Sequence, residues 1–304
     1  MGQRTPLIEG RRVARRGPAG ARGGASLGRL AVALAFLLLL PGGPATAQGS
    51  ADANFANPHE MVTAGREGHA ISGLATFLAG SSGWRRGIAL FPGHPGILRL
   101  REEDGQPVFD LRGNFLVRSR RHWLDPETLV LMVDAPSDEW AAFSQRFRET
   151  PRYGADVRAL IEEAARRYGI GDWTFVGTSE GSISAFHAAR MNPALARRLV
   201  LTSSVFSASR HGPGLSGADF AAYPNPLLWV HHENDPCSAT AYGNAREFAG
   251  RTGKPLVTVR GGGPWRGGAC EAYTAHGFVG LEKEVVAAMK AWVKTGEVPA
   301  DVGP

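Results

Sequence analysis

Short apolar runs alternate with amphipathic stretches along most of the chain. Continuous apolar runs bounded by turn residues are typical of strands that are buried on both faces of a sheet. Six segments have this pattern: 86–91, 129–133, 173–176, 199–202, 227–231 and 255–259. Elsewhere, apolar positions recur with the period of a helix. Three segments have that pattern: 156–168, 182–191 and 282–293.

This alternation predicts an α/β fold with a mostly parallel sheet and helices on both of its faces. Residues 69–79 alternate more weakly and favour antiparallel strands at one edge of the sheet. No repeat, low-complexity linker or block of like charges divides residues 48–304. We therefore expect these 257 residues to form a single domain.

The first 47 residues have the composition of a secretory signal peptide. Seven of them are arginine and one, Glu9, is acidic; an unbroken apolar run fills residues 30–40. Pro-Gly-Gly-Pro then precedes Ala-Thr-Ala at 45–47, the small-x-small pattern of a cleavage site. A run of eleven is shorter than the roughly 20 residues that span a bilayer, which disfavours an uncleaved anchor. We expect Gln48 to begin an exported protein, periplasmic or secreted, without a stable membrane anchor.

The formal net charge of +6 comes wholly from this segment. Residues 48–304 carry 27 basic and 27 acidic residues, so their formal net charge is zero. A protein that binds nucleic acid through its phosphates needs an excess of positive charge. Nucleic acid is therefore not an expected partner. The apolar fraction of 43% and the charged fraction of 20% are ordinary for a globular protein and exclude a disordered chain.

The chain has two cysteines, Cys237 and Cys270. An even, low count in an exported protein indicates one disulfide rather than a metal site, and two free thiols are the alternative. A bridge over this spacing would contribute about 3–4 kcal/mol in the chain-entropy model.

Residues 177–181, Gly-Thr-Ser-Glu-Gly, match the pattern G-x-S-x-G. A predicted strand enters the motif and a predicted helix leaves it, as in the sharp turn that presents a nucleophilic serine. Glycine is needed at both ends because a side chain there would collide with the neighbouring strand or helix. Ser179 would then lie above the sheet edge, near a helix N-terminus that favours negative charge. The alternative is a glycine-rich turn with a solvent-exposed serine.

A nucleophilic serine needs a base, and the base needs an acid to orient it. The predicted strand 227–231 leads into a loop that contains Glu233 and Asp235. An acid just past the carboxyl end of a parallel strand lies at the same sheet edge as Ser179. Asp235 is the first candidate and Glu233 the second. His276 is the only histidine that follows the last predicted strand, and it is the candidate base.

The histidines and acids at 231–235 also invite a metal-site interpretation. Successive residues of a strand point to opposite faces, and no H-E-x-x-H-like spacing occurs. No metal and no cofactor are therefore expected.

Stabilising an oxyanion requires two N–H donors aimed at one point. The main-chain N–H of Glu180, which follows Ser179, is one candidate. The turn at 92–96 is expected to supply the other. Its Pro95 has no N–H, so Gly93, His94 and Gly96 remain, and His94 is favoured. A simple Gly/Pro turn is the alternative interpretation.

Together these segments resemble the serine α/β-hydrolase superfamily over nearly all of residues 48–304. The resemblance implies the α/β-hydrolase fold and the chain order nucleophile, acid, histidine. Ser179 would be the nucleophile, His276 the general base and then acid, and Asp235 its orienting partner. Residues 92–96 look like the family's oxyanion loop, with His94 at the donor position. Pro92 departs from the histidine found there in many members.

The resemblance also gives meaning to two other segments. A Cys237–Cys270 disulfide would tie the acid loop to the histidine loop. Residues 207–223 are short and rich in Gly, Ser and Pro where many members carry a lid, so a loop and an open site are expected.

The function that follows is an exported carboxylic-ester hydrolase that acts through an acyl-enzyme on a small ester or acyl substrate. A peptidase or amidase with the same triad is the first alternative. A catalytically silent hydrolase-fold binding module is the second.

Overall fold

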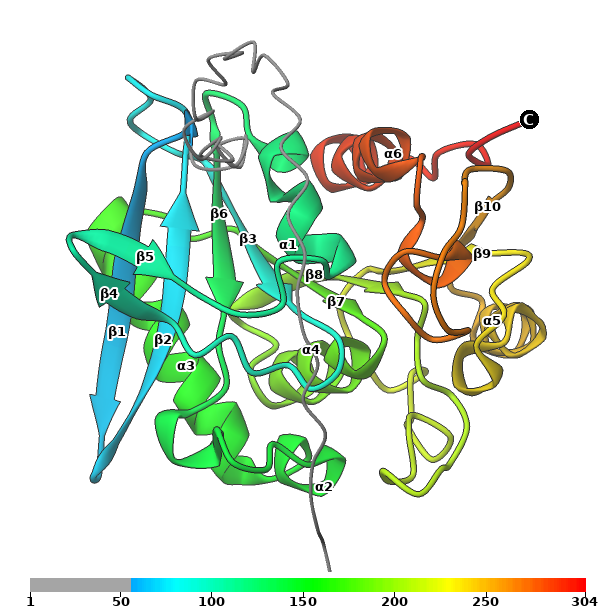
Figure 1. Cartoon of the computed structure of the whole chain (residues 1–304), viewed down its shortest axis with the longest axis horizontal. Helices are drawn as coiled ribbons and strands as arrows, with labels where there is room; N and C mark the ends of the chain where they lie inside the picture. The colour runs from blue at the N-terminus through cyan, green and yellow to red at the C-terminus, as the bar shows by residue number, and fades with distance from the viewer. Residues whose placement is uncertain (1–55) are drawn as a thin grey trace, which may run out of the picture. The chain divides into compact units, whose positions relative to one another are not determined.

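The computed structural model describes residues 56–304 (Figure 1). The predicted signal peptide and its cleavage site lie outside the described residues. Eight strands form one sheet in the order β1-β2-β6-β3-β7-β8-β9-β10. They are β1 (His59–Arg66), β2 (His69–Thr76), β3 (Arg86–Phe91), β6 (Thr128–Val133), β7 (Trp173–Thr178), β8 (Ala196–Thr202), β9 (Leu227–His232) and β10 (Leu256–Val259).

The sheet is parallel from β6 to β10 and antiparallel at the other edge. β3 pairs in parallel with β6 and β7, and the parallel pairing continues through β8, β9 and β10. β2 runs antiparallel to β6, and β1 antiparallel to β2. A separate hairpin consists of β4 (Arg101–Glu103) and β5 (Gln106–Val108). The prediction of a mostly parallel sheet with an antiparallel edge is confirmed.

Helices cover both faces of the sheet, as predicted (Figure 1). They are α1 (Phe115–Ser119), α2 (Gln145–Arg148), α3 (Pro151–Tyr168), α4 (Glu180–Met191), α5 (Tyr242–Thr252) and α6 (Glu282–Thr295). Buried side chains of α3, α4 and α5 belong to one hydrophobic cluster with the sheet. Those of α1 and α6 belong to a second cluster that contains the opposite face. The sheet therefore separates two apolar layers.

The longest helix shows why its sequence folds locally as it does. Thr150 caps the start of α3 by accepting a hydrogen bond from the Tyr153 N–H, and Pro151 occupies the first turn, where it loses no hydrogen bond. Gly169 ends the helix with φ at 69°, a left-handed conformation that glycine adopts without strain. The helix thus begins five residues before the predicted start at 156.

The connection between β8 and β9 contains no helix in residues 207–223. The expectation of a loop in place of a helical lid is therefore correct. Across residues 56–304, no helix is long and apolar enough to cross a bilayer.

Candidate active site

Ser179 occupies the tight turn between β7 and α4. Its φ of 52° and ψ of −128° lie outside the regions that non-glycine residues ordinarily adopt. The main chain holds this conformation on both sides: the Ser179 N–H donates to the Thr202 carbonyl at 3.1 Å, and the Ser182 N–H donates to the Ser179 carbonyl at 2.9 Å. The turn therefore presents the Ser179 side chain at the carboxyl edge of the sheet.

Three glycines make this turn possible. A Cβ on Gly177 would collide with the Gly181 carbonyl, and a Cβ on Gly181 would collide with the carbonyl of Phe91 at the end of β3. A Cβ on Gly93 would lie 3.0 Å from the Ser179 Cβ. The two glycines of the motif thus serve the close approach that the sequence predicts, and Gly93 brings the turn after β3 against the serine.

Asp235 and His276 meet at the same edge. The His276 Nδ1 and the Asp235 Oδ2 are 3.0 Å apart, and both side chains are almost fully buried. The Asp235 carboxylate accepts two further hydrogen bonds. The Thr240 hydroxyl donates to Oδ2 at 2.8 Å, and the Cys237 N–H donates to Oδ1 at 2.9 Å. The carboxylate is therefore fixed in an orientation that faces the imidazole.

The second candidate acid, Glu233, takes a different position. Its carboxylate accepts a hydrogen bond from Arg260 at 3.0 Å, and its N–H donates to the carbonyl of Val259. Among residues 56–304, the carboxylate that contacts His276 is that of Asp235. The structure thus distinguishes the two candidate acids: Asp235 contacts His276, whereas Glu233 pairs with Arg260.

A cavity of about 330 Å³ brings the predicted residues together. Ser179, His276 and His94 all line it. The other lining residues are Gly93, Leu111, Gly113, Asn114, Phe115, Thr178, Cys270, Glu271, Ala272 and Gly277. Within the described chain, no direct hydrogen bond joins Ser179 to His276. Such bonds are often long without substrate and shorten in the substrate complex.

No family model and no curated protein matches this sequence. Solved structures do. Est1E from Butyrivibrio proteoclasticus matches with a TM-score of 0.52 and 14% identity, over 77% of this chain and 97% of that one. A cold-adapted esterase from an Arctic intertidal metagenomic library matches with a TM-score of 0.50 and 13% identity, over 77% and 92%. The chain has the α/β-hydrolase fold.

A third structure of this fold belongs to a much longer protein. It is a putative dipeptidyl aminopeptidase IV from Bacteroides ovatus, with a TM-score of 0.55 and 10% identity. The match covers 78% of this chain and 36% of that one. At such low identities, all three likenesses establish the fold alone.

In this α/β-hydrolase fold, the turn after β3 and the turn that carries Ser179 are linked through side chains. The His94 Nδ1 lies 3.0 Å from the Glu180 carboxylate, which also accepts a hydrogen bond from Gln145 at 3.1 Å. Burial alone would raise the pKa of Glu180, but the hydrogen bond from His94, the charge of Arg148 and the hydrogen bond from Gln145 lower it to about 2. The same hydrogen bond raises the pKa of His94. Glu180 is therefore ionised at neutral pH.

Arg148 of α2 completes this network from a fully buried position. Its guanidinium lies 3.5 Å from the Glu180 carboxylate and donates to the Ser184 hydroxyl at 2.7 Å. It also donates to the carbonyl of Pro95 at 2.7 Å. One cation thus holds the helix after Ser179 and the turn after β3 together. The sequence analysis missed Arg148 because a basic residue in a four-residue helix carries no signal of such a contact.

The two candidate oxyanion donors lie in the two segments that Arg148 joins. In the part of the chain that the structure describes, no residue accepts a hydrogen bond from the main-chain N–H of either His94 or Glu180. His94 is exposed, whereas Glu180 is buried beside Ser179. With no acceptor among the described residues, both N–H groups are free to donate to a bound oxygen.

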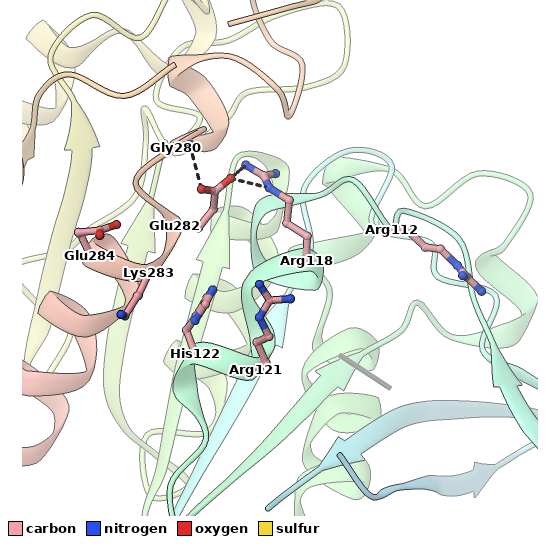
Figure 2. Close-up of a pocket in the computed structure, with 8 residues that line it drawn as sticks. All are labelled: Arg112, Arg118, Arg121, His122, Gly280, Glu282, Lys283 and Glu284. Carbon is pink, nitrogen blue, oxygen red and sulfur yellow. Dashed lines mark hydrogen bonds and ion pairs between the residues drawn. The ribbon is translucent and has the colours of Figure 1, made fainter. Parts of the chain in front are cut away.

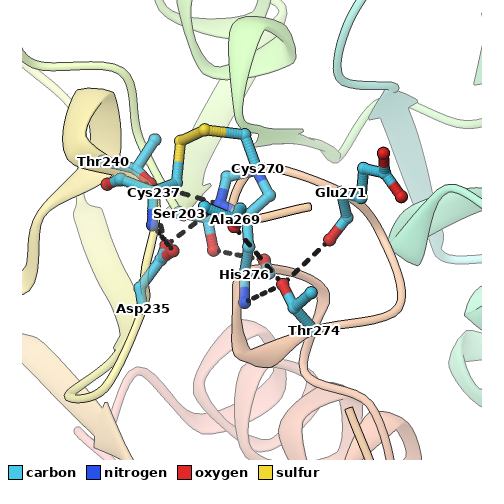
Figure 3. Close-up of a disulfide and its surroundings, with 9 residues drawn as sticks. All are labelled: Ser203, Asp235, Cys237, Thr240, Ala269, Cys270, Glu271, Thr274 and His276. Atoms are coloured by element: carbon cyan, nitrogen blue, oxygen red, sulfur yellow. Dashed lines mark hydrogen bonds and ion pairs between the residues drawn. A yellow bond between two sulfur atoms is a disulfide. The ribbon is translucent and has the colours of Figure 1, made fainter. Parts of the chain in front are cut away.

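Cys237 and Cys270 form a disulfide, as predicted, with their Cα atoms 4.6 Å apart (Figure 3). Cys237 follows Asp235 and contacts its carboxylate through the main chain, whereas Cys270 lines the cavity. The disulfide therefore joins the loop of Asp235 to the loop that leads to His276.

His276 itself is held by its own main chain. It lies in a short 3-10 turn, Ala275–Gly277, that Thr274 caps by accepting the His276 N–H at 3.1 Å. The Ser203 hydroxyl donates to the His276 carbonyl at 2.8 Å. Ser203, which follows β8, and Thr274 thus hold the main chain of His276, and Asp235 orients its imidazole.

A second, more open cleft of about 580 Å³ lies beside α1 and the start of α6 (Figure 2). Arg118 lines it and pairs with Glu282 at 2.9 Å. The same guanidinium donates to the carbonyls of Gly113 and Gly277, both of which line the cavity of Ser179. Arg118 therefore connects the wall of the cavity at α1 to the turn of His276.

Proposed function

We propose that the protein is a serine hydrolase that cleaves a carboxylic ester through an acyl-enzyme. Ser179 is the nucleophile, His276 the general base and then acid, and Asp235 its orienting partner. The observation that carries this proposal is the 3.0 Å contact between His276 and Asp235 at the cavity that Ser179 also lines. The strained turn of Ser179 supports the same roles, because such strain is typical of functional residues.

The reaction follows from these positions. The Ser179 Oγ attacks the acyl carbon while its proton passes to His276. The carbonyl oxygen becomes negative and accepts hydrogen bonds from the N–H groups of His94 and Glu180. Collapse breaks the bond to the leaving alcohol, which takes the proton from His276. Water then attacks the acyl-enzyme by the same route, releasing the acid and restoring Ser179.

An ester is the first candidate because two of the similar structures are named esterases, which is consistent with a small ester substrate. The peptidase in the comparison is matched over only 36% of its length. A peptidase or amidase with the same triad remains the second candidate, since the chemistry of acyl transfer is shared.

We also propose that the protein is exported, with residues 1–47 as its signal peptide. The Cys237–Cys270 disulfide supports this proposal, because such bonds persist in oxidising compartments.

A fluorophosphonate probe tests the nucleophile. We expect the probe to label the folded wild-type protein and Ser216→Ala, a control that removes an exposed serine, but not Ser179→Ala. Labelling that survives Ser179→Ala would assign the nucleophile to another residue. A folded wild-type protein that is not labelled would reject the serine-hydrolase proposal altogether.

Substrate class is tested with p-nitrophenyl esters of graded chain length beside aminoacyl anilides. Turnover of the esters with little turnover of the anilides is expected, and the reverse would favour the peptidase. Because a general base must be unprotonated, kcat/KM should fall on the acid side of its pH profile. A kcat/KM that does not fall at acid pH would contradict a general base at this position.

A further inference from the structure

Asn114 lies at the cavity in a position that the proposed mechanism does not use. It precedes α1 and lines the cavity together with Ser179 and His276. A carbon atom added to Gly93 would lie 3.0 Å from the Ser179 Cβ and 3.2 Å from the Asn114 Nδ2. The side-chain amide and the nucleophile therefore border the same small volume. That volume adjoins the peptide that carries the His94 N–H.

The orientation of this amide is fixed by its oxygen. Asn114 Oδ1 accepts a hydrogen bond from the Leu116 N–H at 3.1 Å and so caps α1. The oxygen is thus directed to the helix, and the Nδ2 group, with its two N–H donors, is the end that approaches Gly93. No residue within 56–304 accepts a hydrogen bond from Nδ2. The cap therefore accounts for the oxygen of Asn114 and leaves the nitrogen without a structural role.

The main chain around Asn114 is held firmly. The Asn114 N–H donates to the Leu111 carbonyl at 2.8 Å, and the Arg118 N–H donates to the Asn114 carbonyl at 2.9 Å. The Arg118 guanidinium also binds the Gly113 carbonyl, as well as the Gly277 carbonyl in the turn of His276. The Nδ2 donor is thus fixed relative to the candidate base before substrate arrives, which is the condition for effective stabilisation of charge.

We infer that Asn114 Nδ2 is a third hydrogen-bond donor to the acyl oxygen of the substrate, beside the N–H groups of His94 and Glu180. This inference rests on the proposed function. The amide stays neutral and gives up no proton; its N–H bond dipole points to the oxygen on which negative charge develops. The contact strengthens as the carbonyl becomes an oxyanion, so its main effect is on kcat rather than on KM.

Two substitutions separate this role from the cap. Serine and aspartate are both good N-cap residues, so Asn114→Ser and Asn114→Asp keep an acceptor for the Leu116 N–H while removing the amide donor. Thr150→Ala is the matched control, because it removes the cap of α3 at a helix that does not line the cavity. Each variant is assayed for kcat and KM on a p-nitrophenyl ester, for thermal unfolding and for labelling by a fluorophosphonate.

We expect Asn114→Ser to lower kcat about 10²–10³-fold when kcat is calculated per site that the fluorophosphonate labels. The change in KM should be smaller, and the midpoint of thermal unfolding should stay close to that of the wild type. Asn114→Asp should lower kcat further, because its carboxylate repels the oxyanion. Thr150→Ala should lower the midpoint of unfolding and leave kcat unchanged.

Two results would overturn the inference. One is an Asn114→Ser protein whose kcat lies within about threefold of wild type. The other is a loss of kcat in Asn114→Ala that Asn114→Ser restores, because only the cap would then matter. Failure of the proposed function is distinguishable: Ser179→Ala would then keep its activity, whatever the variants of Asn114 do.

Discussion

Replacing Arg148 with methionine should weaken both the folded state and the active site. The Arg148 side chain is fully buried, and the partner carboxylate of Glu180 is only 10% exposed. Removing one partner of a buried ion pair leaves the other charge without compensation, which costs about 3–5 kcal/mol. The carbonyl of Pro95 and the hydroxyl of Ser184 lose a donor at the same time. We therefore expect the free energy of unfolding of Arg148→Met to fall by about 3–5 kcal/mol.

Urea unfolding measures this loss, and Arg158→Met provides the matched control. Arg158 pairs with Glu162 at the surface, where both side chains are more than half exposed. An exposed pair of this kind contributes about 0–1 kcal/mol. A difference of several kcal/mol between the two variants is the expected result.

A double-mutant cycle with Glu180→Gln isolates the pair itself. Because the second substitution removes the stranded charge, the double variant should be more stable than the sum of the two single losses predicts, by about 0.5–3 kcal/mol. Turnover per folded molecule should also fall in Arg148→Met, since the turn after β3 loses its contact with the helix of Ser179. A stability within about 1 kcal/mol of wild type, or strict additivity in the cycle, would refute this reasoning.

Three further predictions follow from separate features. Replacing both Cys237 and Cys270 with serine should lower the free energy of unfolding by about 3–4 kcal/mol, since the bridge spans 33 residues. It should also reduce kcat at a temperature where the variant is folded, and unchanged kcat would show that the bridge does not position the proposed triad. Burial lowers the pKa of His187 to about 4. Because the unfolded chain takes up this proton near pH 6.5, His187 should contribute a loss of stability of about 1 kcal/mol per pH unit, measured by urea unfolding, as the pH drops from 6.5 to 4. His187→Gln should flatten that dependence, and an unchanged slope would contradict it. Gly181→Ala should fail to fold or lose turnover because its Cβ meets the carbonyl of Phe91, whereas Gly243→Ala, with open space around it in α5, should keep both thermal stability and turnover.

The sheet could be predicted well because its strands are buried on both faces. All six predicted parallel strands are present, and their boundaries differ by two residues at most, except at the start of β8, which lies three residues earlier than predicted. A strand such as β6 consists entirely of buried residues, so its apolar run has no polar interruption. A strand that is buried on both faces has a continuous apolar run, which is easily recognised in a sequence.

Elements that are short or have little buried surface were not predicted. In α5, only Ala245 and Phe248 are buried, and no side chain caps its start. The hairpin of β4 and β5 is mostly exposed, and α1 has only five residues. Such segments lack a sustained apolar period, so tertiary contacts decide their structure.

The candidate site was predictable where topology governs it. Parallel strands end at one edge, so residues that follow β7 and β9 were expected to lie close together. Arg148 and Asn114 were not predictable, because they meet their partners across loops. Arg148, for example, contacts a carbonyl 53 residues away. The choice between Glu233 and Asp235 also needed coordinates, because β9 ends at His232 and Glu233 pairs directly with the end of β10.

The candidate site draws on segments from Gly93 to His276, and the strand next to the histidine loop lies at the far edge of the sheet. A growing chain that has not yet reached residue 276 holds the turn of Ser179 but lacks the proposed base, His276. Since chains are made from the N-terminus at about 5–20 residues per second, β3, β7 and β8 exist for seconds before that residue does. Chain order alone therefore keeps the proposed hydrolytic site incomplete during synthesis.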